Sequence, residues 1–461
     1  MKLHPYQQEV PYMQAYNHVS LDSGRNMVLL LQRLSGGSPT FHDYGPDHPS
    51  TVLDLGCGPG YWAQQAAALW PTSQITGFDL VDMISTSCRL PSNVKFVQGD
   101  FLNFALPFES FAFELVRMSD LSLCIPHDKW DLLLSEVKRV LKIGGRLELI
   151  DDEIFFPYRN QDLALTRRHP SDCDKLRFSS QNLNGSRVLS FQDTEGNTYP
   201  IFCRKSLFNK PGSVISPLGE VRSQKLVRAS RDLEIVFERM LLERYKIHVR
   251  PADFLLGFLR STFGKPGSRC KTYKLKLPKT SEREIGPLRQ PDVTRGQDNA
   301  RIQRFGIKWP FPSIFKRKRI LGLITKFYAP RNDPLRYRAR SPSTTQPTFA
   351  LMAASSTYLG MSAEEVEMHA CKYIHTLLGC RAALKDFVQQ FRGDDGEVCV
   401  NDQEFDEELW QYECFRRARL DLPNECFDLG LPPKAKRRAI VSEASIEIRR
   451  IKVYEVVKRK P

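Results

Sequence analysis

The sequence predicts an α/β fold in which a mostly parallel sheet is covered by helices and ends in one antiparallel strand. Three observations predict it. Short apolar runs alternate with longer amphipathic stretches between residues 51 and 150, a glycine-rich turn follows the first of these runs, and a last run alternates polar and apolar residues from Ile446 onward. The 461 residues, 41% of them hydrophobic, are enough for a large core, so disorder throughout the chain is excluded.

The alternation between residues 51 and 150 predicts a βαβ series, which implies a parallel sheet with helices on both faces. We expect the strands at Thr51–Leu55, Gln74–Asp79, Val94–Gln98, Phe113–Arg117 and Arg146–Ile150. We expect the helices at Tyr61–Leu69, near Val81–Cys88 and at Lys129–Leu141, with one more before the series at Leu21–Leu34.

The chain after Pro157 is less regular, and its turn signals, Asn184-Gly185 among them, predict loops and a hairpin. Helical spacing returns later. We expect two packed helices within residues 225–263, helices over 352–391 with a capping box of Ser362 and Glu365, and a helix over 403–420. Residues 445–458 are expected to return to the sheet as its antiparallel strand.

Positive charge is concentrated in one segment. Residues 261–340 hold 21 Lys and Arg against 5 Asp and Glu, whereas residues 1–160 hold 12 against 18. Such a segment either binds nucleic acid, an anionic membrane surface or an import receptor, or is a solvated, partly disordered insert. Both interpretations stay open. The basic clusters KRKR (residues 316–319) and KAKRR (434–438) look like import signals, so we expect a cytoplasmic or nuclear protein.

The eleven cysteines are scattered and include no C-x-x-C pair, which favours reduced thiols and argues against a metal site. The first residues, MKLHPYQQEVPYMQAYNHV, contain no apolar signal region. No run approaches the roughly 18 apolar residues of a membrane helix. We therefore expect neither secretion nor a membrane span.

The strongest motif is VLDLGCGPGYW at residues 52–62, where a hydrophobic strand runs directly into Gly56, Gly58 and Gly60 and then into a helix. Glycine can adopt a positive φ, and it lets the backbone approach a ligand closely where a strand end meets a helix N-terminus. By itself the turn is a weak signal, because a tight strand-to-helix connection has the same composition.

Two further strand ends make the motif more specific. Asp79 ends the second strand, where its carboxylate is placed to accept hydrogen bonds from both hydroxyls of a ribose, and Leu80 beside it would cover one face of the base. After the third strand, Asp100 is placed to accept an adenine amino group, while the N–H of Phe101 faces a ring nitrogen. Three successive strand ends thus converge on one nucleoside.

These motifs, together with FELVRMSDL at 113–121 and EVKRVLKIGGRLELIDDE at 136–153, resemble the class I S-adenosylmethionine-dependent methyltransferases, whose sheet is Rossmann-like. The resemblance implies S-adenosylmethionine as cofactor, with Asp54 close to its methionine amino group and Met118 lining the methionine pocket. Through LQRLSGGSP at 31–39 and RLELIDDEIFFP at 146–157 it extends to a fungal group related to regulators of secondary metabolism. It covers residues 6–157 well and only pieces of the later chain.

A dinucleotide is the alternative ligand, because NAD enzymes also place a glycine turn before an acidic residue. The spacing here is G-x-G-x-G rather than G-x-G-x-x-G, which favours S-adenosylmethionine. No catalytic residue is identified. Asp151, Asp152 and Glu153 follow the fifth strand, where one of them is a candidate general base or holds a cationic acceptor, unless all three belong to a solvated loop.

The resemblance therefore implies a methyltransferase that acts on a small-molecule or protein acceptor, and the alternative is a regulatory protein that binds S-adenosylmethionine with little turnover. We expect a cofactor-binding core at residues 1–157 and inserted loops and helices near the acceptor site at 158–263. A basic, poorly ordered segment would follow at 264–345, and C-terminal helices with the closing strand at 346–461. Tyr12, Tyr16 and Asp22 either close over the cofactor or pack against the sheet.

Overall fold

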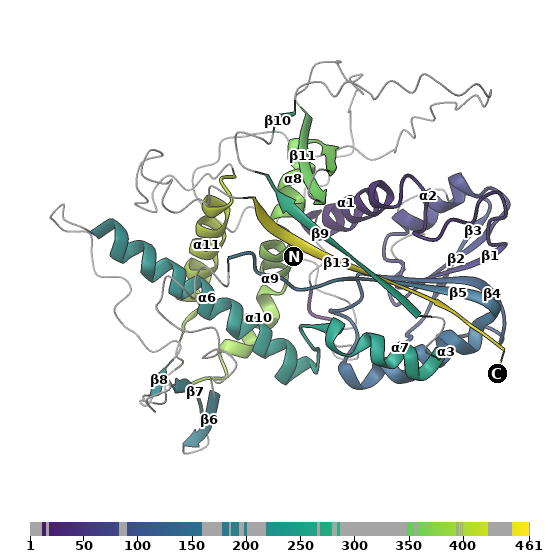
Figure 1. Cartoon of the computed structure of the whole chain (residues 1–461). Coiled ribbons are helices and arrows are strands. Elements are labelled where there is room, and N and C mark those ends of the chain that lie inside the picture. Colours follow the sequence, from purple (N-terminus) through teal and green to yellow (C-terminus); the bar gives the residue numbers. More distant parts are fainter. Residues whose placement is uncertain are drawn as a thin grey trace.

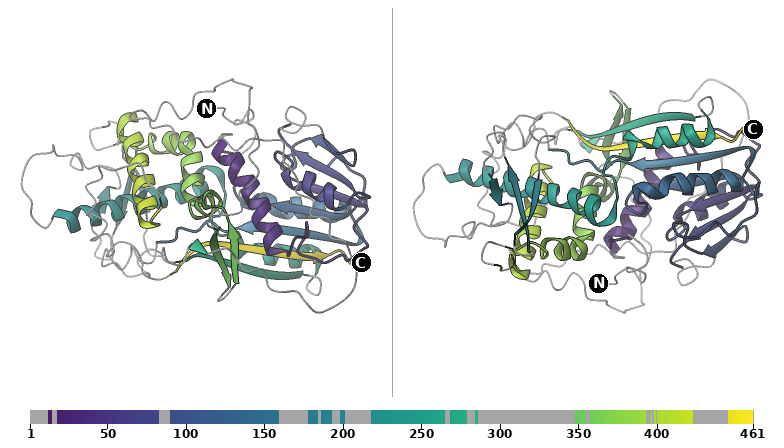
Figure 2. Two further views of the ribbon diagram at one scale, coloured as in Figure 1. Left: turned by 90° about the horizontal axis from the view of Figure 1, so that it is seen from above. Right: turned by 90° about the horizontal axis from the view of Figure 1, so that it is seen from below.

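The computed structural model describes most of the chain, and the fold is built from these residues: 12–14, 18–82, 90–158, 178–183, 186–192, 198–200, 218–264, 268–278, 284–285, 348–354, 357–392, 396, 398, 400–422 and 445–460. They form one large sheet with helices on both faces, and a body of helices at one end of it (Figures 1 and 2).

The parallel part of the sheet has the order β5-β4-β1-β2-β3, which confirms the predicted α/β class. Its strands are β1 (Thr51–Leu55), β2 (Gln74–Asp79), β3 (Val94–Gln98), β4 (Phe113–Ser119) and β5 (Leu141–Asp152). The chain adds strands on one side of β1 and then on the other, so the sheet has a switch point between β1 and β4. At such a point the carboxyl ends of the strands leave a crevice for a ligand.

Helices cover both faces of the parallel strands (Figure 1): α1 (His18–Leu34) and α2 (Tyr61–Leu69) lie on one face, α3 (Trp130–Val140) and α7 (Leu255–Phe263) on the other. Leu133, Leu134 and Val137 are buried on one side of α3, at the spacing that places side chains on a single helical face. The short turns η1 (His127–Lys129) and η2 (Pro251–Asp253) precede α3 and α7. The helix predicted near Val81–Cys88 falls mostly on residues 83–89, outside the described residues.

The closing strand β13 (Ile446–Val457) lies antiparallel between β5 and β9 (Ser268–Leu277), as predicted for residues 445–458. Poor order is expected over residues 264–345, but this segment contains the well-formed strand β9. That expectation is wrong there because the basic run alternates: Leu275 and Leu277 are buried while Lys274 and Lys276 are exposed. Its paired backbone covers the outer edge of β13.

Residues 348–361 form a hairpin of β11 (Thr348–Ala354) and β12 (Thr357–Met361), and β10 (Glu284–Ile285) pairs with β11. The prediction of a helix from Met352 is therefore wrong over these residues, since sheet pairing overrides the helix propensity of the run ALMAA. The helices begin at α8 (Ala363–Ala370). Its capping box is confirmed, with Glu365 N–H donating to Ser362 Oγ at 3.1 Å and Ser362 N–H to Glu365 Oε2 at 2.9 Å.

The helical body holds α6 (Leu218–Tyr245), α9 (Lys372–Gly379), α10 (Arg381–Val388) and α11 (Asp402–Arg419). α11 has nearly the ends predicted over 403–420, whereas α6 begins at Leu218, before the helices predicted from residue 225. Its core joins that of α1 and β13 in one cluster that includes Val236, Phe237, Leu377 and Leu384. A separate small sheet contains β6 (Phe178–Leu183), β7 (Ser186–Gln192) and β8 (Thr198–Pro200). In it, β6 and β7 flank Asn184-Gly185 as the predicted hairpin.

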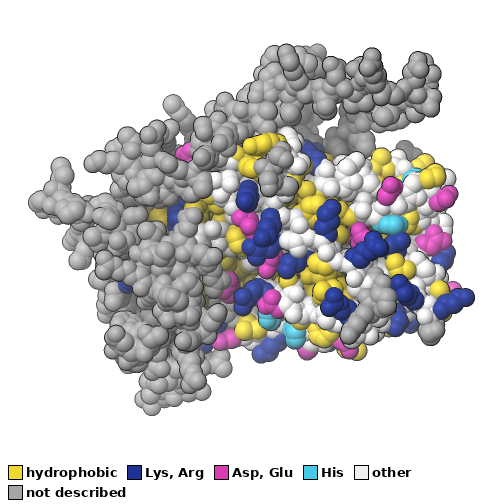
Figure 3. Space-filling view, viewed as in Figure 1, with side chains coloured by type: hydrophobic (Ala, Val, Ile, Leu, Met, Phe, Trp, Pro, Cys, Tyr) yellow, Lys and Arg dark blue, Asp and Glu magenta, His cyan; other side chains and the backbone are white. Residues whose placement is uncertain are grey.

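Several sequence expectations concern the surface and the cysteines. Lys and Arg side chains on the face of Figure 3 are interspersed with apolar and acidic ones. No helix of the described residues has the length and apolar character of a membrane span. Both basic clusters, 316–319 and 434–438, lie outside the described residues.

Thiols are found at Cys57, Cys124, Cys270, Cys371 and Cys380. Cys414 is in a disulfide, so the expectation of reduced thiols is wrong at that residue.

Candidate active site

A cavity of about 230 Å³ lies over the carboxyl ends of β1 to β4. Its walls are the loop after β1, the ends of β2, β3 and β4, and, from the other side, α1 and α9. Seven of the nine predicted site residues line it: Asp54, Gly56, Gly58, Asp79, Leu80, Asp100 and Phe101. Gly60 and Met118 do not.

The glycine turn has the backbone that its composition predicts. Gly56 has φ 74° and Gly58 has φ 52°, the left-handed region that side chains disfavour. A Cβ at Gly56 would collide with Leu121, whereas a Cβ at Gly58 would point into open space at the cavity wall. Gly60 has a structural role. Its N–H donates a hydrogen bond to the Cys57 carbonyl at 3.0 Å, which closes the turn, and it directly precedes the first residue of α2.

Asp79 ties this turn to the end of β2. Its Oδ2 accepts the Gly58 N–H at 2.8 Å and its Oδ1 accepts the Val81 N–H at 3.2 Å. Burial raises the pKa of Asp79, while these N–H groups lower it in part. Each carboxylate oxygen has a second lone pair, so both can still accept hydrogen bonds from ribose hydroxyls. The residue thus fits the role predicted for it.

Asp100 is held in place by its own turn. Its Oδ1 accepts the Leu102 N–H at 2.8 Å and its Oδ2 accepts from the Asn103 side chain at 2.7 Å. Leu80 and Phe101 line the cavity beside it, where their apolar surfaces suit the faces of a base. The end of β3 therefore presents a fixed acceptor next to apolar side chains.

Asp54 forms a buried ion pair that sequence reasoning missed. Its Oδ1 lies 3.0 Å from Nη1 of Arg117, the register neighbour of Asp54 on β4, and both side chains line the cavity. Met118 does not line the pocket, contrary to the prediction, because successive side chains of a strand point to opposite faces. Arg117 faces the cavity, and Met118 packs in the core with Trp130 and Leu133.

The wall opposite the strand ends comes from α9, which sequence reasoning also missed. Lys372, His375 and Thr376 line the cavity from one helical face, and Lys372 Nζ lies 2.9 Å from Oδ2 of Asp120, just after β4. Burial lowers the pKa of His375 to about 3, so its imidazole is neutral at neutral pH. The i, i+3, i+4 spacing of these polar residues on an otherwise apolar helix was the available signal.

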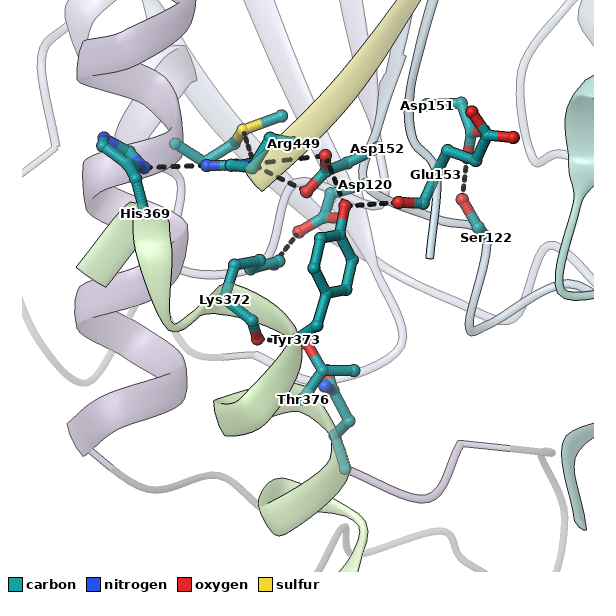
Figure 4. Close-up of polar contacts among 12 residues, drawn as sticks. Asp120, Ser122, Asp151, Asp152, Glu153, His369, Lys372, Tyr373, Thr376 and Arg449 are labelled. Atoms are coloured by element: carbon teal, nitrogen blue, oxygen red, sulfur yellow. Dashed lines mark hydrogen bonds and ion pairs between the residues drawn. The ribbon is translucent and has the colours of Figure 1, made fainter. Parts of the chain in front are cut away.

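The three acidic residues at the end of β5 form a buried network (Figure 4). Asp152 accepts hydrogen bonds from Arg449 Nη2 at 2.6 Å and from the Tyr373 hydroxyl at 2.9 Å, and Ser122 donates to Asp151. Burial raises the pKa of Asp151 to about 7. The solvated-loop interpretation is wrong, and none of Asp151, Asp152 and Glu153 lines the cavity. They join β5 to β13 and α9.

The N-terminal residues contribute to the other side of the cavity. Tyr12 lines it, as do Ser20, Ser23 and Met27 from the first turns of α1. Asp22 does not line it, and Tyr16 lies outside the described residues. α1 therefore covers the strand ends, and of the two described residues expected to close over the cofactor only Tyr12 lies at the cavity.

Residues 52–145 match the family model described as a methyltransferase domain. A malonyl-[acyl-carrier protein] O-methyltransferase of Legionella pneumophila is 30% identical over 105 residues, which are 22% of this chain and 35% of that protein. Methyltransferase str2 of Strobilurus tenacellus is 31% identical over 150 residues, 31% of this chain and 50% of the relative. The secondary metabolism regulator laeA of Coprinopsis cinerea is 29% identical over 27% of each chain.

The chain spans about a third of the length of the first curated relatives that it matches. Among solved structures, human N-acetylserotonin methyltransferase in complex with SAM has 22% identity and a TM-score of 0.23, over 29% of this chain and 39% of that one. The matched residues 52–145 contain β1 to β4, the glycine turn and the predicted nucleoside-binding positions. Residues 52–145 therefore match a methyltransferase domain, and they belong to a mostly parallel sheet of the class I methyltransferase type.

Proposed function

We propose that the protein is an S-adenosylmethionine-dependent methyltransferase that transfers a methyl group to a small-molecule or protein acceptor. The observation that carries this proposal is the convergence of the glycine turn and the ends of β2, β3 and β4 on one cavity. Asp79 would accept hydrogen bonds from the ribose, Asp100 and the Phe101 N–H would bind the adenine, and Leu80 would cover one face of the base.

The bound cofactor supplies a methyl group on a positively charged sulfur. An in-line displacement at that methyl needs no nucleophile on the protein, so the chain contributes mainly by orienting the acceptor and excluding water. The side chains of α1 and α9, which cover the strand ends, are placed to do both.

We place the acceptor between the end of β4 and α9. Ser119 and Asp120 line this side of the cavity together with Lys372 and His375. The charges of Lys372 and Asp120 cancel in their ion pair, and His375 is neutral. An uncharged acceptor group, such as a hydroxyl, therefore meets no unpaired charge there, and it would find a hydrogen-bond partner in the imidazole.

The narrower relationship and the location of the protein are also proposals. A relationship to fungal regulators of secondary metabolism is supported by the laeA and str2 relatives, which come from fungi. Cytoplasmic or nuclear residence is supported by the two basic clusters of the sequence, through which an import receptor would bind. Binding to nucleic acid is supported only by the basic composition of residues 261–340.

Calorimetry tests the cofactor. We expect S-adenosylmethionine and S-adenosylhomocysteine to bind to the full chain and NADH not to bind, because the three strand ends suit one adenosine and the glycine spacing does not suit a pyrophosphate. Binding of NADH without any response to S-adenosylmethionine would overturn the proposal.

Methyl transfer itself is tested with the purified chain, S-adenosylmethionine labelled on its methyl group, and a cell extract separated into small-molecule and protein fractions. We expect label in one of these fractions. Cofactor binding without label in any fraction would favour the alternative, a regulatory protein that binds the cofactor with little turnover.

A further inference from the structure

His375 brings an imidazole to the acceptor side of the cavity. It lies on α9 three residues after Lys372, whose Nζ is 2.9 Å from Oδ2 of Asp120 (Figure 4). This ion pair holds α9 against the end of β4, and Lys372 and His375 line the cavity from the same side of the helix. Both lie outside residues 52–145, which match the methyltransferase domain. The imidazole is therefore supplied by the helices that follow the matched domain.

The hydrogen-bonding capacity of His375 is not fully used by the fold. Its Nδ1 is buried and has no hydrogen-bond partner among the described residues. The side chain as a whole is only partly buried, and it lines the cavity. A buried polar atom without a partner costs free energy in the folded chain. At a cavity wall, such a residue is expected to act on a ligand.

The surroundings of the imidazole keep it unprotonated. Burial, followed by the positive charges of Arg417 on α11, Lys372 on α9 and His18 on α1, lowers the pKa of His375 to about 3. The neutral imidazole has one nitrogen with a free lone pair. The form that can accept a proton is therefore the one present at neutral pH.

The carboxylates of the cavity have other partners. Asp79 and Asp100 are proposed to hold the nucleoside, and Asp54 and Asp120 each have a cationic partner within 3.0 Å. These four and His375 are the carboxylate and imidazole side chains that line the cavity in the described part of the chain. His375 is thus the group best placed to take a proton from an acceptor.

We propose that the acceptor group is a hydroxyl and that His375 accepts its proton during methyl transfer, an inference that rests on the proposed function. The hydroxyl oxygen forms a bond to the methyl carbon, while the bond between carbon and sulfur breaks and leaves its electron pair on sulfur. The hydroxyl proton passes to the imidazole and then to water. One positive charge thus moves from the sulfonium to the imidazolium, and the total charge is unchanged.

A weakly basic imidazole is sufficient for this step. An oxygen that gains a methyl group before it loses its proton becomes an oxonium, which is a far stronger acid than an imidazolium. The positive charge on sulfur disappears as the methyl group leaves, so one charge that disfavours the imidazolium is removed. Because its pKa is low, the imidazolium then releases the proton to water, and neutral His375 is restored.

Methyl transfer by the full chain tests this proposal, with S-adenosylmethionine labelled on its methyl group and the extract fraction that becomes labelled. The variant His375→Gln keeps a hydrogen-bonding side chain that cannot take up a proton. Its transfer rate at neutral pH should fall about 100-fold or more, the range for the loss of a general base. Its affinity for S-adenosylhomocysteine should stay within about twofold. An unchanged transfer rate would overturn the proposal.

The dependence of the rate on pH distinguishes a proton acceptor from a structural residue. Between about pH 6 and pH 9 the unmodified chain should transfer at a nearly constant rate, because its imidazole stays neutral. The residual rate of His375→Gln should instead rise about tenfold per pH unit, because only the ionised hydroxyl reacts readily without a base. A rate reduced by the same factor at every pH would show a merely structural role and overturn the proposal.

His48→Gln is the matched control, because Nδ1 of His48 is also buried without a partner among the described residues, yet His48 does not line the cavity. This variant should transfer at the rate of the unmodified chain. Mass spectrometry of the labelled product identifies the atom that is methylated. A methyl group on nitrogen or sulfur would overturn this inference and leave the proposed function intact, whereas absence of label from every fraction would overturn both.

Discussion

At the scale of single residues, Asp79 links the fold to the site. The carboxylate that accepts the Gly58 N–H fixes the glycine turn against the end of β2, and Asp79 also lines the cavity. The residue that positions the turn is therefore also the residue proposed to bind the ribose. A substitution there is expected to act on the ligand, since the turn is also closed by the Gly60 N–H bond to Cys57.

We expect Asp79→Ala to weaken the binding of S-adenosylhomocysteine by roughly 1–3 kcal/mol, the range for the loss of hydrogen bonds to a charged group. Titration calorimetry measures the change. Asp43→Ala is the matched control, because Asp43 also accepts a glycine N–H, from Gly45 at 2.8 Å, in an exposed turn away from the cavity. An Asp79→Ala protein with unchanged affinity would show that Asp79 does not contact the ribose.

Glu148 is a buried carboxyl group whose ionisation should affect stability. Its Oε2 accepts the Phe41 N–H at 2.7 Å, and burial raises its pKa to about 7, although the charge of Arg117 lowers it in part. Between the ordinary pKa of 4.5 and about 7, the folded chain retains a proton that the unfolded chain releases. Stability contributed by the protonated group is therefore present at low pH and lost as the pH rises through this window.

Glu148→Gln should remove this dependence. We expect the stability of the unmodified protein relative to Glu148→Gln to fall as the pH is raised from about 5 to about 8, by at most about 3 kcal/mol. Denaturant unfolding of both proteins across this range measures it. Asp151, whose pKa is also raised to about 7, is present in both proteins, so its contribution cancels. A difference that does not change with pH would contradict the expectation.

At the scale of elements, the sequence pattern predicted the helices and strands whose ends depend on neighbouring residues alone. β1, β2, β3 and α2 have the predicted ends, because their apolar spacing and the glycine turn lie within each segment. β9 was missed because its basic side chains hide a pattern that depends on pairing with β13. The wall of the cavity formed by α9 depends on a contact between Asp120 and Lys372, which are 252 positions apart, and no local pattern contains such a contact.

One arginine of β13 contacts both β5 and α8 through its side chain. Arg449 is 1% exposed, donates to Asp152 at 2.6 Å and lies 2.7 Å from Nδ1 of His369 (Figure 4). In Arg449→Met the carboxylate of Asp152 would stay buried without its cation. We expect this variant to lose about 3–5 kcal/mol of unfolding free energy, as for a buried ion pair with one partner removed.

Denaturant unfolding measures this loss, and the double variant Asp152→Asn/Arg449→Met distinguishes its cause. The double variant should be more stable than Arg449→Met, because it leaves no uncompensated charge. Arg450→Met is the matched control: its partly exposed ion pairs should contribute less than about 1 kcal/mol. A double variant no more stable than Arg449→Met would show that lost packing, rather than the unpaired carboxylate, causes the effect.

At the scale of the whole molecule, residues far along the chain complete the sheet that residues 52–145 begin. β9, β11 and β13 extend it beyond β5, and α9 closes the cavity, although the family match ends at residue 145. We propose that the chain is one elaborated domain in which residues from about 158 to 350 are inserted before the closing strand. The core cluster shared by α1, α6, α9 and β13 supports this organisation.

Within that insertion, residues 286–347 should be dispensable for the core. They hold 14 Lys and Arg against 3 Asp and Glu, and they connect Ile285 to Thr348, which are paired in register on the antiparallel strands β10 and β11. An Asn-Gly pair in place of residues 286–347 would join these strands as a two-residue hairpin. No residue that lines the cavity in the described structure lies in the replaced stretch.

We expect this shortened chain to bind S-adenosylhomocysteine with an affinity within about twofold of the full chain. It should unfold at the same or a higher temperature, because a shorter loop loses less entropy on closure. Calorimetry and thermal unfolding measure the two quantities. Extending the replacement to residues 286–354 provides the control, since it also removes β11, whose Ala350 and Leu351 are fully buried, and this protein should be destabilised. Loss of cofactor binding in the shorter replacement would show that residues 286–347 belong to the core.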